Sequence, residues 1–251
     1  MKKLFVISVF LTLTYSLFAL DNKQILINAN KAYTDGLYTN ALDLYKQVLK
    51  AGYESSALYY NIGNVYYKMN DFTSAILFYE RAKKLNPGDE DIEYNLKVAN
   101  SKIPDKIEPM PELFYRRWYG ALTSQFSADT WAITAIAGFI ITLILAGFYL
   151  ISRILFVRKA GFWLGIIFFF LSLACIIFAY QNFRTAKNQT EAIIFAPTVT
   201  IKSSPDEKSI DLFVLHEGTK VQLLDQIGTW FEIKIANGSV GWLPSSSVER
   251  I

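Results

Sequence analysis

The sequence predicts a multi-domain membrane protein with a helical repeat domain, a transmembrane helical hairpin and a small all-β domain. Three observations support this prediction. Residues 130–152 and 160–183 hold no charge, and each run has the roughly 20 apolar residues that a helix needs to cross a bilayer core. Residues 22–87 repeat with a period of 34. Residues 191–251 form short runs that alternate between apolar and polar side chains, as half-buried strands do.

Between the two apolar runs lies a short basic segment, residues 153–159. It holds Arg153, Arg158 and Lys159 and no acidic residue. Short loops rich in Lys and Arg stay in the cytoplasm, so we expect a cytoplasmic loop, with both ends of the chain on the outer side of the membrane, which in a bacterium is the periplasm. The alternative is a pair of buried helices in a soluble core, but such helices are usually shorter and have a polar face.

The chain starts with the pattern of an export signal. Met1 is followed by Lys2 and Lys3, and residues 4–20 carry no charge. A positive start, a short apolar stretch and a small residue before the cut are typical of a secretory signal peptide, here residues 1–19 with cleavage after Ala19. The alternative is an uncleaved anchor helix. Both interpretations send the residues that follow across the membrane.

Composition excludes several functional classes. Residues 21–104 carry ten basic and ten acidic side chains, and residues 191–251 carry five and eight, so neither region has the basic surface that nucleic-acid binding requires. Cys175, within the second apolar run, is the one cysteine, and His216 is the one histidine. An active site needs a convergent set of titratable groups. We therefore expect no enzyme activity, no cofactor and no metal site.

Two copies of a helix–turn–helix unit, residues 22–55 and 56–89, form most of a repeat domain over residues 21–101. Tyr45 in the first copy matches Tyr79 in the second, where an aromatic side chain fills the space between units. The second copy resembles the tetratricopeptide repeat, and the first departs from that pattern at three positions. The residues that carry the resemblance are Tyr59, Ile62, Gly63, Tyr66, Asp71, Phe72, Ala75, Tyr79, Ala82 and Pro87.

Residues 89–101 follow as one further helix, which resembles the capping helix of such arrays. The resemblance implies a concave face that is lined by the first helix of each unit and binds protein partners. The candidate partner-binding residues on this face are Asn30, Tyr33, Tyr60, Asn64, Tyr67 and Lys68. The family's peptide-carboxylate clamp needs a lysine where Leu26 and Tyr60 stand, so we do not expect that binding mode. The alternative is that Asn64 and Tyr67 only follow the repeat consensus.

Residues 102–128 connect the repeats to the first apolar run. Their first part holds three prolines and alternating charges, which predicts an extended spacer. Within residues 113–126, Phe114, Trp118 and Leu122 fall at helical spacing, which predicts a helix lying on the membrane surface. The alternative is an amphipathic helix packed on the repeats.

Residues 191–251 are predicted to form a compact β domain, and Asn237-Gly238 is the strongest short signal for a hairpin within it. The predicted strands are 193–195, 198–202, 211–215, 221–225, 230–235, 239–243 and 248–250. The residues that carry a resemblance to the bacterial SH3-like barrel are Gly218, Trp230, Gly241 and Trp242. We expect Trp242 to fill the barrel interior and Trp230 to face outward as a partner contact.

The order of these parts resembles the BatE proteins of the Bacteroides aerotolerance operon, and the ending DLFVLHEGTKVQLLD…ANGSVGWLPSSSVERI is especially close. That resemblance implies an inner-membrane scaffold or assembly factor associated with aerotolerance and stress tolerance. The partners that it implies are proteins with von Willebrand A domains and, through them, a MoxR-type ATPase, together with membrane lipid. The competing hypothesis is a cell-wall protein whose SH3-like domain binds or senses peptidoglycan.

Overall fold

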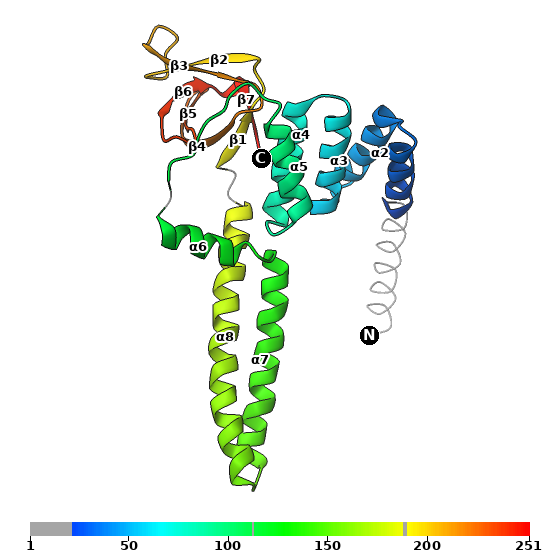
Figure 1. Cartoon of the computed structure of the whole chain (residues 1–251), viewed down its shortest axis with the longest axis vertical. Coiled ribbons are helices and arrows are strands. Elements are labelled where there is room, and N and C mark those ends of the chain that lie inside the picture. The colour runs from blue at the N-terminus through cyan, green and yellow to red at the C-terminus, as the bar shows by residue number, and fades with distance from the viewer. Residues whose placement is uncertain (1–21, 112, 188–189) are drawn as a thin grey trace, which may run out of the picture.

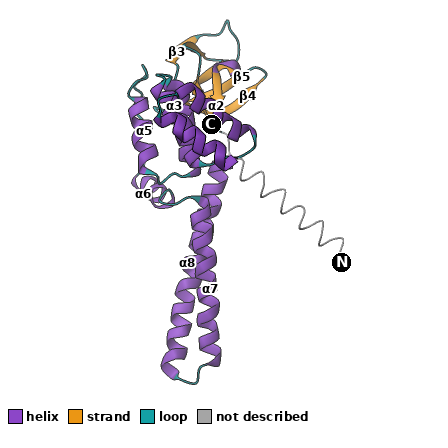
Figure 2. Cartoon of the chain, turned by 90° about the vertical axis from the view of Figure 1, so that its right-hand side faces the viewer, coloured by secondary structure: helices purple, strands orange, loops and turns teal. Residues whose placement is uncertain are grey.

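The computed structural model describes residues 22–111, 113–187 and 190–251. An array of helices and an antiparallel sheet lie side by side at one end of a long two-helix hairpin (Figure 1, Figure 2). The prediction of helical repeats, two long apolar helices and a C-terminal β region is therefore confirmed. The predicted signal peptide, residues 1–19, lies outside the described residues.

The repeat array has five described helices. The first covers residues 22–34. The helices that follow are α2 (Tyr38–Lys50), α3 (Ser56–Lys68), α4 (Phe72–Leu85) and α5 (Glu90–Asn100). In each unit the chain turns through a residue in the left-handed region, Gly36 at φ +78° and Asn70 at φ +63°. Glycine and asparagine tolerate this conformation best, so the two turns of the 34-residue period have the same geometry.

Small residues set the spacing of the helices in the array. A Cβ atom at Gly63 would come within 2.6 Å of the Tyr79 ring, so a glycine lets α3 and α4 approach closely. The start of α4 is capped, because the Asp71 carboxylate accepts a hydrogen bond from the backbone N–H of Ser74 at 3.0 Å. A cap of this kind typically stabilises a protein by about 1 kcal/mol.

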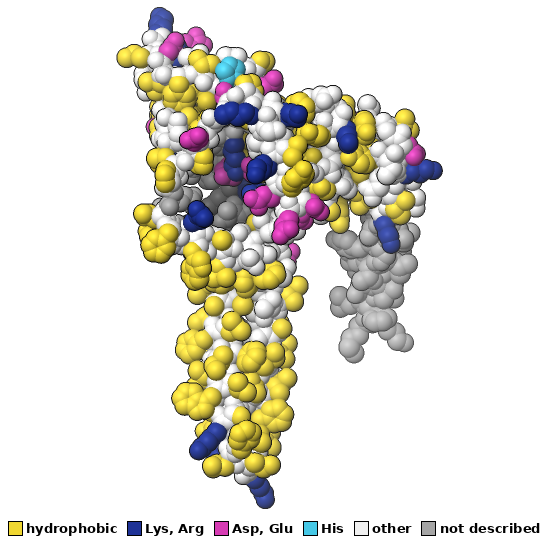
Figure 3. Space-filling view, viewed as in Figure 1, with side chains coloured by type: hydrophobic (Ala, Val, Ile, Leu, Met, Phe, Trp, Pro, Cys, Tyr) yellow, Lys and Arg dark blue, Asp and Glu magenta, His cyan; other side chains and the backbone are white. Residues whose placement is uncertain are grey.

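The hairpin consists of α7 (Ala128–Ile151) and α8 (Leu155–Lys187), and both helices are long and apolar enough to cross a membrane. In the most apolar 18-residue stretch of each helix, only 11% and 17% is buried within the protein. Apolar side chains cover the surface of the hairpin (Figure 3). A core helix of a soluble protein would be mostly buried. The Ser172 hydroxyl donates to the carbonyl of Ala135 at 2.7 Å, which joins the two helices.

The predicted basic loop, residues 153–159, is shorter than expected. α8 begins at Leu155, so the connection is only residues 152–154, and Arg158 and Lys159 belong to the first turns of the helix. α8 begins five residues before the predicted span, which started at residue 160. Its basic residues fit within the helix because their long side chains can carry their charges past the end of an apolar helix. The positive charge stays at the tip of the hairpin (Figure 3).

Helix α6 (Phe114–Thr123) lies across the end of the hairpin that is nearest the repeats and the sheet (Figure 1). The Tyr119 hydroxyl donates to Gln181 Oε1 on α8 at 2.6 Å. Phe114 and Trp118 are 85% and 69% exposed. The helix therefore packs on the hairpin, and it leaves large aromatic side chains uncovered beside it.

The C-terminal part is an antiparallel sheet of seven strands in the order β3-β2-β6-β5-β4-β1-β7. The strands are β1 (Glu191–Ile194), β2 (Thr198–Lys202), β3 (Asp211–His216), β4 (Lys220–Ile227), β5 (Trp230–Lys234), β6 (Val240–Pro244) and β7 (Val248–Arg250). The Asn237-Gly238 turn joins β5 to β6, as predicted. The predicted barrel is not closed, because β3 and β7 are opposite edges of the described sheet and closure would require them to pair.

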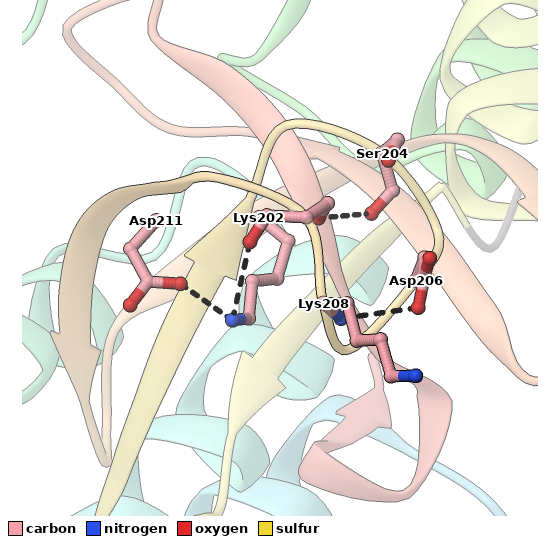
Figure 4. Close-up of polar contacts among 6 residues, drawn as sticks. Lys202, Ser204, Asp206, Lys208 and Asp211 are labelled. Carbon is pink, nitrogen blue, oxygen red and sulfur yellow. Dashed lines mark hydrogen bonds and ion pairs between the residues drawn. The ribbon is translucent and has the colours of Figure 1, made fainter.

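Charged side chains order the loop between β2 and β3, at the open edge of the sheet (Figure 4). The Lys202 ammonium pairs with the Asp211 carboxylate at the base of this loop. Asp206 Oδ1 accepts a hydrogen bond from the backbone N–H of Lys208 at 3.0 Å. Charged residues at a free strand edge disfavour pairing with other chains.

Residues 102–104 form a turn and bends, and residues 105–111 form neither helix nor strand. This segment, predicted as an extended spacer, is docked along the protein. Ile103 is buried in the repeat core, and Ile107 packs against the sheet core. The backbone N–H of Met110 donates to the carbonyl of Ala236, beside the β5–β6 turn, at 3.0 Å. The segment therefore contacts both modules and holds them together.

Strand β1 joins the sheet to the repeat array through its two faces. Ala192 and Ile194 belong to the sheet core, whereas Ile193 belongs to the repeat core, and all three are fully buried. Ile251, directly after β7, also packs in the repeat core. Because successive side chains of a strand point to opposite faces, β1 completes one core with each face.

An ion triad crosses this boundary. Lys220 Nζ on β4 lies 2.9 Å from Glu80 Oε2 on α4 and 2.9 Å from Glu191 Oε2 on β1. Burial lowers the pKa of Lys220, but the two carboxylates outweigh burial and hold its pKa above its ordinary value. The side chain of Glu80 is only 11% exposed, so its charge depends on Lys220 for a partner.

A second polar contact joins the linker to the sheet. Asp105 Oδ2 accepts hydrogen bonds from the backbone N–H of His216 at 2.8 Å and from the Thr219 hydroxyl at 2.7 Å. Its other carboxylate oxygen lies 2.7 Å from His216 Nδ1. Burial raises the pKa of Asp105, but the hydrogen bonds outweigh burial and hold its pKa below its ordinary value.

We predict that Lys220→Met lowers the free energy of unfolding by about 1–3 kcal/mol, because it leaves the Glu80 carboxylate without its partner. Chemical denaturation of the full chain in detergent, followed by tryptophan fluorescence, measures this change. Lys208→Met removes the same charge from the exposed β2–β3 loop and serves as the control, with an expected change within about 0.5 kcal/mol. Equal effects of the two substitutions would contradict the role of the triad.

The lowered pKa of Asp105 predicts that the free energy of unfolding decreases as the pH falls into the acid range. Such a carboxylate contributes stability above its unfolded pKa of about 4, and this contribution is lost as the pH falls through the folded pKa. We expect Asp105→Asn to be less stable than the wild type by about 1 kcal/mol at neutral pH, with the difference disappearing in acid. Thermal unfolding of both proteins across the acid range checks this, and parallel curves would refute it.

Candidate functional site

Five of the residues predicted for the concave face of the array line one pocket of about 380 Å³, here called the repeat groove. Tyr33 comes from the first helix, and the others come from α3. The predicted residues in the lining are Tyr33, Tyr60, Asn64, Tyr67 and Lys68. The remaining lining residues are Tyr79 on α4 and Tyr94, Asn95 and Val98 on α5. The groove therefore lies between the first helices of the two units and α5.

A buried tyrosine orients an asparagine in each unit. The Tyr79 hydroxyl donates to Asn64 Oδ1 at 2.7 Å, and the Tyr45 hydroxyl donates to Asn30 Oδ1 at 2.6 Å. Both tyrosines are 1% exposed, so their rings are fixed by packing. In each unit the donor lies 15 residues after the acceptor, and the 34-residue period thus repeats a hydrogen bond as well as a fold.

Helix α5 completes this network with a second amide. Asn95 Nδ2 donates to Asn64 Oδ1 at 3.0 Å and to the Tyr60 hydroxyl oxygen at 2.8 Å. Asn64 Oδ1 therefore accepts two hydrogen bonds, one from Tyr79 and one from Asn95. Within the described residues Asn64 Nδ2 and the Tyr60 hydroxyl hydrogen have no acceptor, so both remain for a ligand.

The electrostatics of the repeat groove favour an electron-rich ligand. Lys68 lines the groove, and none of the lining residues is acidic. Burial raises the pKa of Tyr33 and of Tyr79, so both hydroxyls keep their hydrogens at neutral pH. The groove thus presents hydrogen-bond donors, one cation and aromatic walls. Carbonyl and carboxylate oxygens are the ligand groups that fit it.

Two predicted residues lie outside the groove lining. Asn30 is one helical turn before Tyr33, and Asn61 Nδ2 lies 3.5 Å from its Oδ1, so it borders the groove along the same face. Trp230 is half-buried at the start of β5 in the sheet, where it pairs with Pro244 of β6. The structure therefore does not bring Trp230 together with the other candidates.

The expectation that Trp242 fills the sheet interior is wrong. Trp242 is half-buried and pairs with Glu232, whereas its neighbours Gly241 and Leu243 are buried. Alternation along β6 places Leu243 in the core and Trp242 on the outer face. The small Gly241 leaves space on the inner face that Ile201 occupies, since a Cβ atom there would clash with the Ile201 side chain.

The α5 residues of the groove were not found from the sequence. Ile92, Leu96 and Ala99 account for the apolar stripe of this helix, and the polar positions beside the stripe resemble an ordinary solvated face. The sequence did contain one indication. Asn95 immediately precedes Leu96 of the apolar stripe, which places its amide at the edge of the packed face. Recognising its role requires the position of α3.

The described residues contain no group of three or more His, Cys, Asp and Glu that could hold a metal ion. His216 is engaged by Asp105 in the linker contact. Among the described residues, the repeat groove is the site where the predicted partner-binding side chains come together.

Comparison with known proteins bears on the helical array. Residues 56–89, which cover α3, α4 and the turn after them, match the family described as Tetratricopeptide repeat. The first helix and α2 lie outside the match, so their assignment as a further copy stays a prediction, supported by the Tyr45–Asn30 bond. No curated protein matches the chain.

Proposed function

We propose that this protein is a membrane-anchored scaffold whose repeat groove binds an extended peptide segment of a protein partner. The observation that carries this proposal is the fixed polarity of the groove, in which the oxygen of Asn64 is occupied and its N–H groups are left to donate. Tetratricopeptide repeats bind proteins, and five of the nine residues that line the groove lie in the matched stretch. The proposed function is binding rather than catalysis.

An extended peptide suits this groove because its backbone presents a carbonyl oxygen at every residue. Asn64 Nδ2 and the Tyr60 hydroxyl would donate to such oxygens, while Tyr33 and Tyr67 would cover the chain with aromatic surface. Lys68 adds attraction for an acidic side chain. The pattern selects for acceptors and disfavours a segment that presents Lys or Arg to the groove.

The proposal also gives the protein a place and an orientation. α7 and α8 would span a bacterial inner membrane with the basic tip in the cytoplasm. The repeats and the sheet would then both lie in the periplasm, since they sit at the same end of the hairpin (Figure 1). Helix α6, with its exposed Phe114 and Trp118, would lie in the interface where aromatic side chains are enriched.

The resemblance to BatE proteins is the sole ground for naming partners. It extends the proposal to an assembly with von Willebrand A-domain proteins and a MoxR-type ATPase, in the context of aerotolerance. The SH3-like assignment of the sheet rests on the same kind of argument, from Gly218, Trp230, Gly241 and Trp242.

The groove is tested by reversing its polarity. Asn64→Asp keeps the oxygen that accepts from Tyr79 and Asn95 but replaces the donating Nδ2 with a second acceptor. Loss of an interface hot spot costs about 2 kcal/mol or more, so we expect partner binding to weaken by roughly 30-fold. Affinity purification from detergent-solubilised membranes, with partners identified and quantified by mass spectrometry, measures the effect.

Asn40→Asp is the matched control, because it adds the same charge at an exposed position of α2 outside the groove lining. Partner recovery with this variant should equal that of the wild type, and both variants should be present at normal levels. Full recovery with Asn64→Asp would exclude the groove as the docking surface. A loss shared by both variants would indicate a general effect of charge instead.

The orientation is tested by labelling single cysteines in a Cys175→Ser background. Asp35→Cys lies in the turn of the first unit, Lys208→Cys in the β2–β3 loop and Lys159→Cys at the tip of the hairpin. In intact spheroplasts a membrane-impermeant maleimide should label the first two, and it should label the third only after the membrane is opened. Labelling of only one of Asp35→Cys and Lys208→Cys would contradict the hairpin topology.

A further inference from the structure

Two cavities meet where the hairpin joins the soluble modules. The first is an apolar groove of about 630 Å³ between α7 and α8, lined by residues that include Ala132, Phe139 and Ala179. The second is a more polar pocket of about 260 Å³ at the ends of α4 and α8. The cavities share Ala128, Asp129 and Phe183 in their linings. They therefore form one continuous site, apolar along the hairpin and polar where the soluble modules begin.

The polar pocket carries charges of both signs. Lys84, Lys187 and Asp129 line it, together with Asn182 and Ser127. The Lys84 ammonium donates to the carbonyl oxygen of Ile251 at 3.2 Å. Lys187 and Asp129 are exposed, and within the described residues neither forms a salt bridge. The Lys187 ammonium lies 5.9 Å from the centre of the Phe183 ring, and Phe183 also lines the apolar groove. Lys187 and Asp129, of opposite charge, thus stand at the mouth of an apolar cavity.

We propose that this composite site binds a single aminophospholipid from the membrane. One acyl chain lies in the groove between α7 and α8, the phosphate faces Lys187, and the ammonium group of the headgroup faces Asp129. The charge pattern favours this ligand. Lys187 and Asp129 match the phosphate and the amine of a zwitterionic headgroup, whereas Lys84 is bonded to the carbonyl oxygen of Ile251. Each cavity, at about 630 and 260 Å³, is near or within the range of ligand sites, about 300–1,000 Å³.

A transmembrane helix of a partner is the competing occupant, since small residues line helix–helix contacts in membranes. The charges at the mouth distinguish the two, because a helix that fills the apolar groove would not by itself supply a phosphate and an amine at adjacent positions. The inference rests on the proposed membrane insertion of α7 and α8. Its test must therefore separate failure of insertion from failure of lipid binding.

The test uses the full chain, reconstituted in vesicles of phosphatidylethanolamine and phosphatidylglycerol in equal amounts and then extracted in mild detergent for native mass spectrometry. The wild type should retain one phosphatidylethanolamine molecule. Ala132→Leu places a larger side chain in the groove and should abolish this retention. Ala137→Leu makes the same change on the same helix at an exposed position outside the lining, and it should retain the lipid.

Charge variants test the headgroup. Lys187→Gln should weaken retention by roughly tenfold, the effect of losing one charge-assisted hydrogen bond. Asp129→Asn should remove the preference for phosphatidylethanolamine over phosphatidylglycerol and keep lipid retention itself. Arg184→Gln, on the same helix outside both linings, is the control and should behave as the wild type.

Each outcome decides the proposal. Equal retention by Ala132→Leu and Ala137→Leu would mean nonspecific lipid around the hairpin and would overturn the site. A wild type that prefers phosphatidylglycerol would overturn the headgroup assignment. Capture of a protein helix by a photo-crosslinker at Ile136 would overturn the assignment of a lipid as the occupant of the groove. Alkaline extraction is done first: a chain released from membranes refutes the proposed anchoring, whereas an integral chain without bound lipid refutes this inference alone.

Discussion

Strand β1 belongs to two hydrophobic cores at once, and the placement of the soluble elements depends on it. Ile193 packs with the repeats, while Ala192 and Ile194 pack with the sheet. A shift of one residue in its register would exchange these faces, so the strand is fixed from both sides. The sheet consequently sits against α4, and no residue of the sheet enters the lining of the repeat groove. The sheet therefore packs on the array and leaves the repeat groove open.

The polarity of the repeat groove is determined by two neighbours of Asn64 that also line the groove, Tyr79 and Asn95. Tyr79 is held by its packing, and its hydroxyl occupies the oxygen of Asn64. Asn95 occupies the same oxygen from α5. An asparagine in solution offers a donor and an acceptor equally, but here only the donor faces the groove. A residue that fills the space between helices thereby also decides which chemical groups the surface recognises.

Short sequence patterns predicted the helices and strands, which depend on residues close together in the sequence. β2 and β7 have their predicted bounds, because alternation and turn residues act over a few positions. The contacts between modules are long-range: Glu80 and Lys220 are 140 residues apart, and Asp105 and His216 are 111 apart. Each is a single polar residue in an ordinary stretch, so no period or motif marks it. The contacts of the edge strand β7 are also long-range, because Arg81 of α4 donates to Glu249 and to the carbonyl oxygen of Arg250.

The junction of the docked modules with the hairpin has a consequence for affinity. Because the array, the sheet and α6 gather at one end of the hairpin (Figure 1), a bilayer around α7 and α8 would hold the groove at a constant height above its surface. A partner anchored in the same bilayer would then search two dimensions rather than three, and tethering of this kind can raise the effective concentration to about millimolar. A contact too weak to isolate in solution would suffice between such neighbours, and it could exchange rapidly.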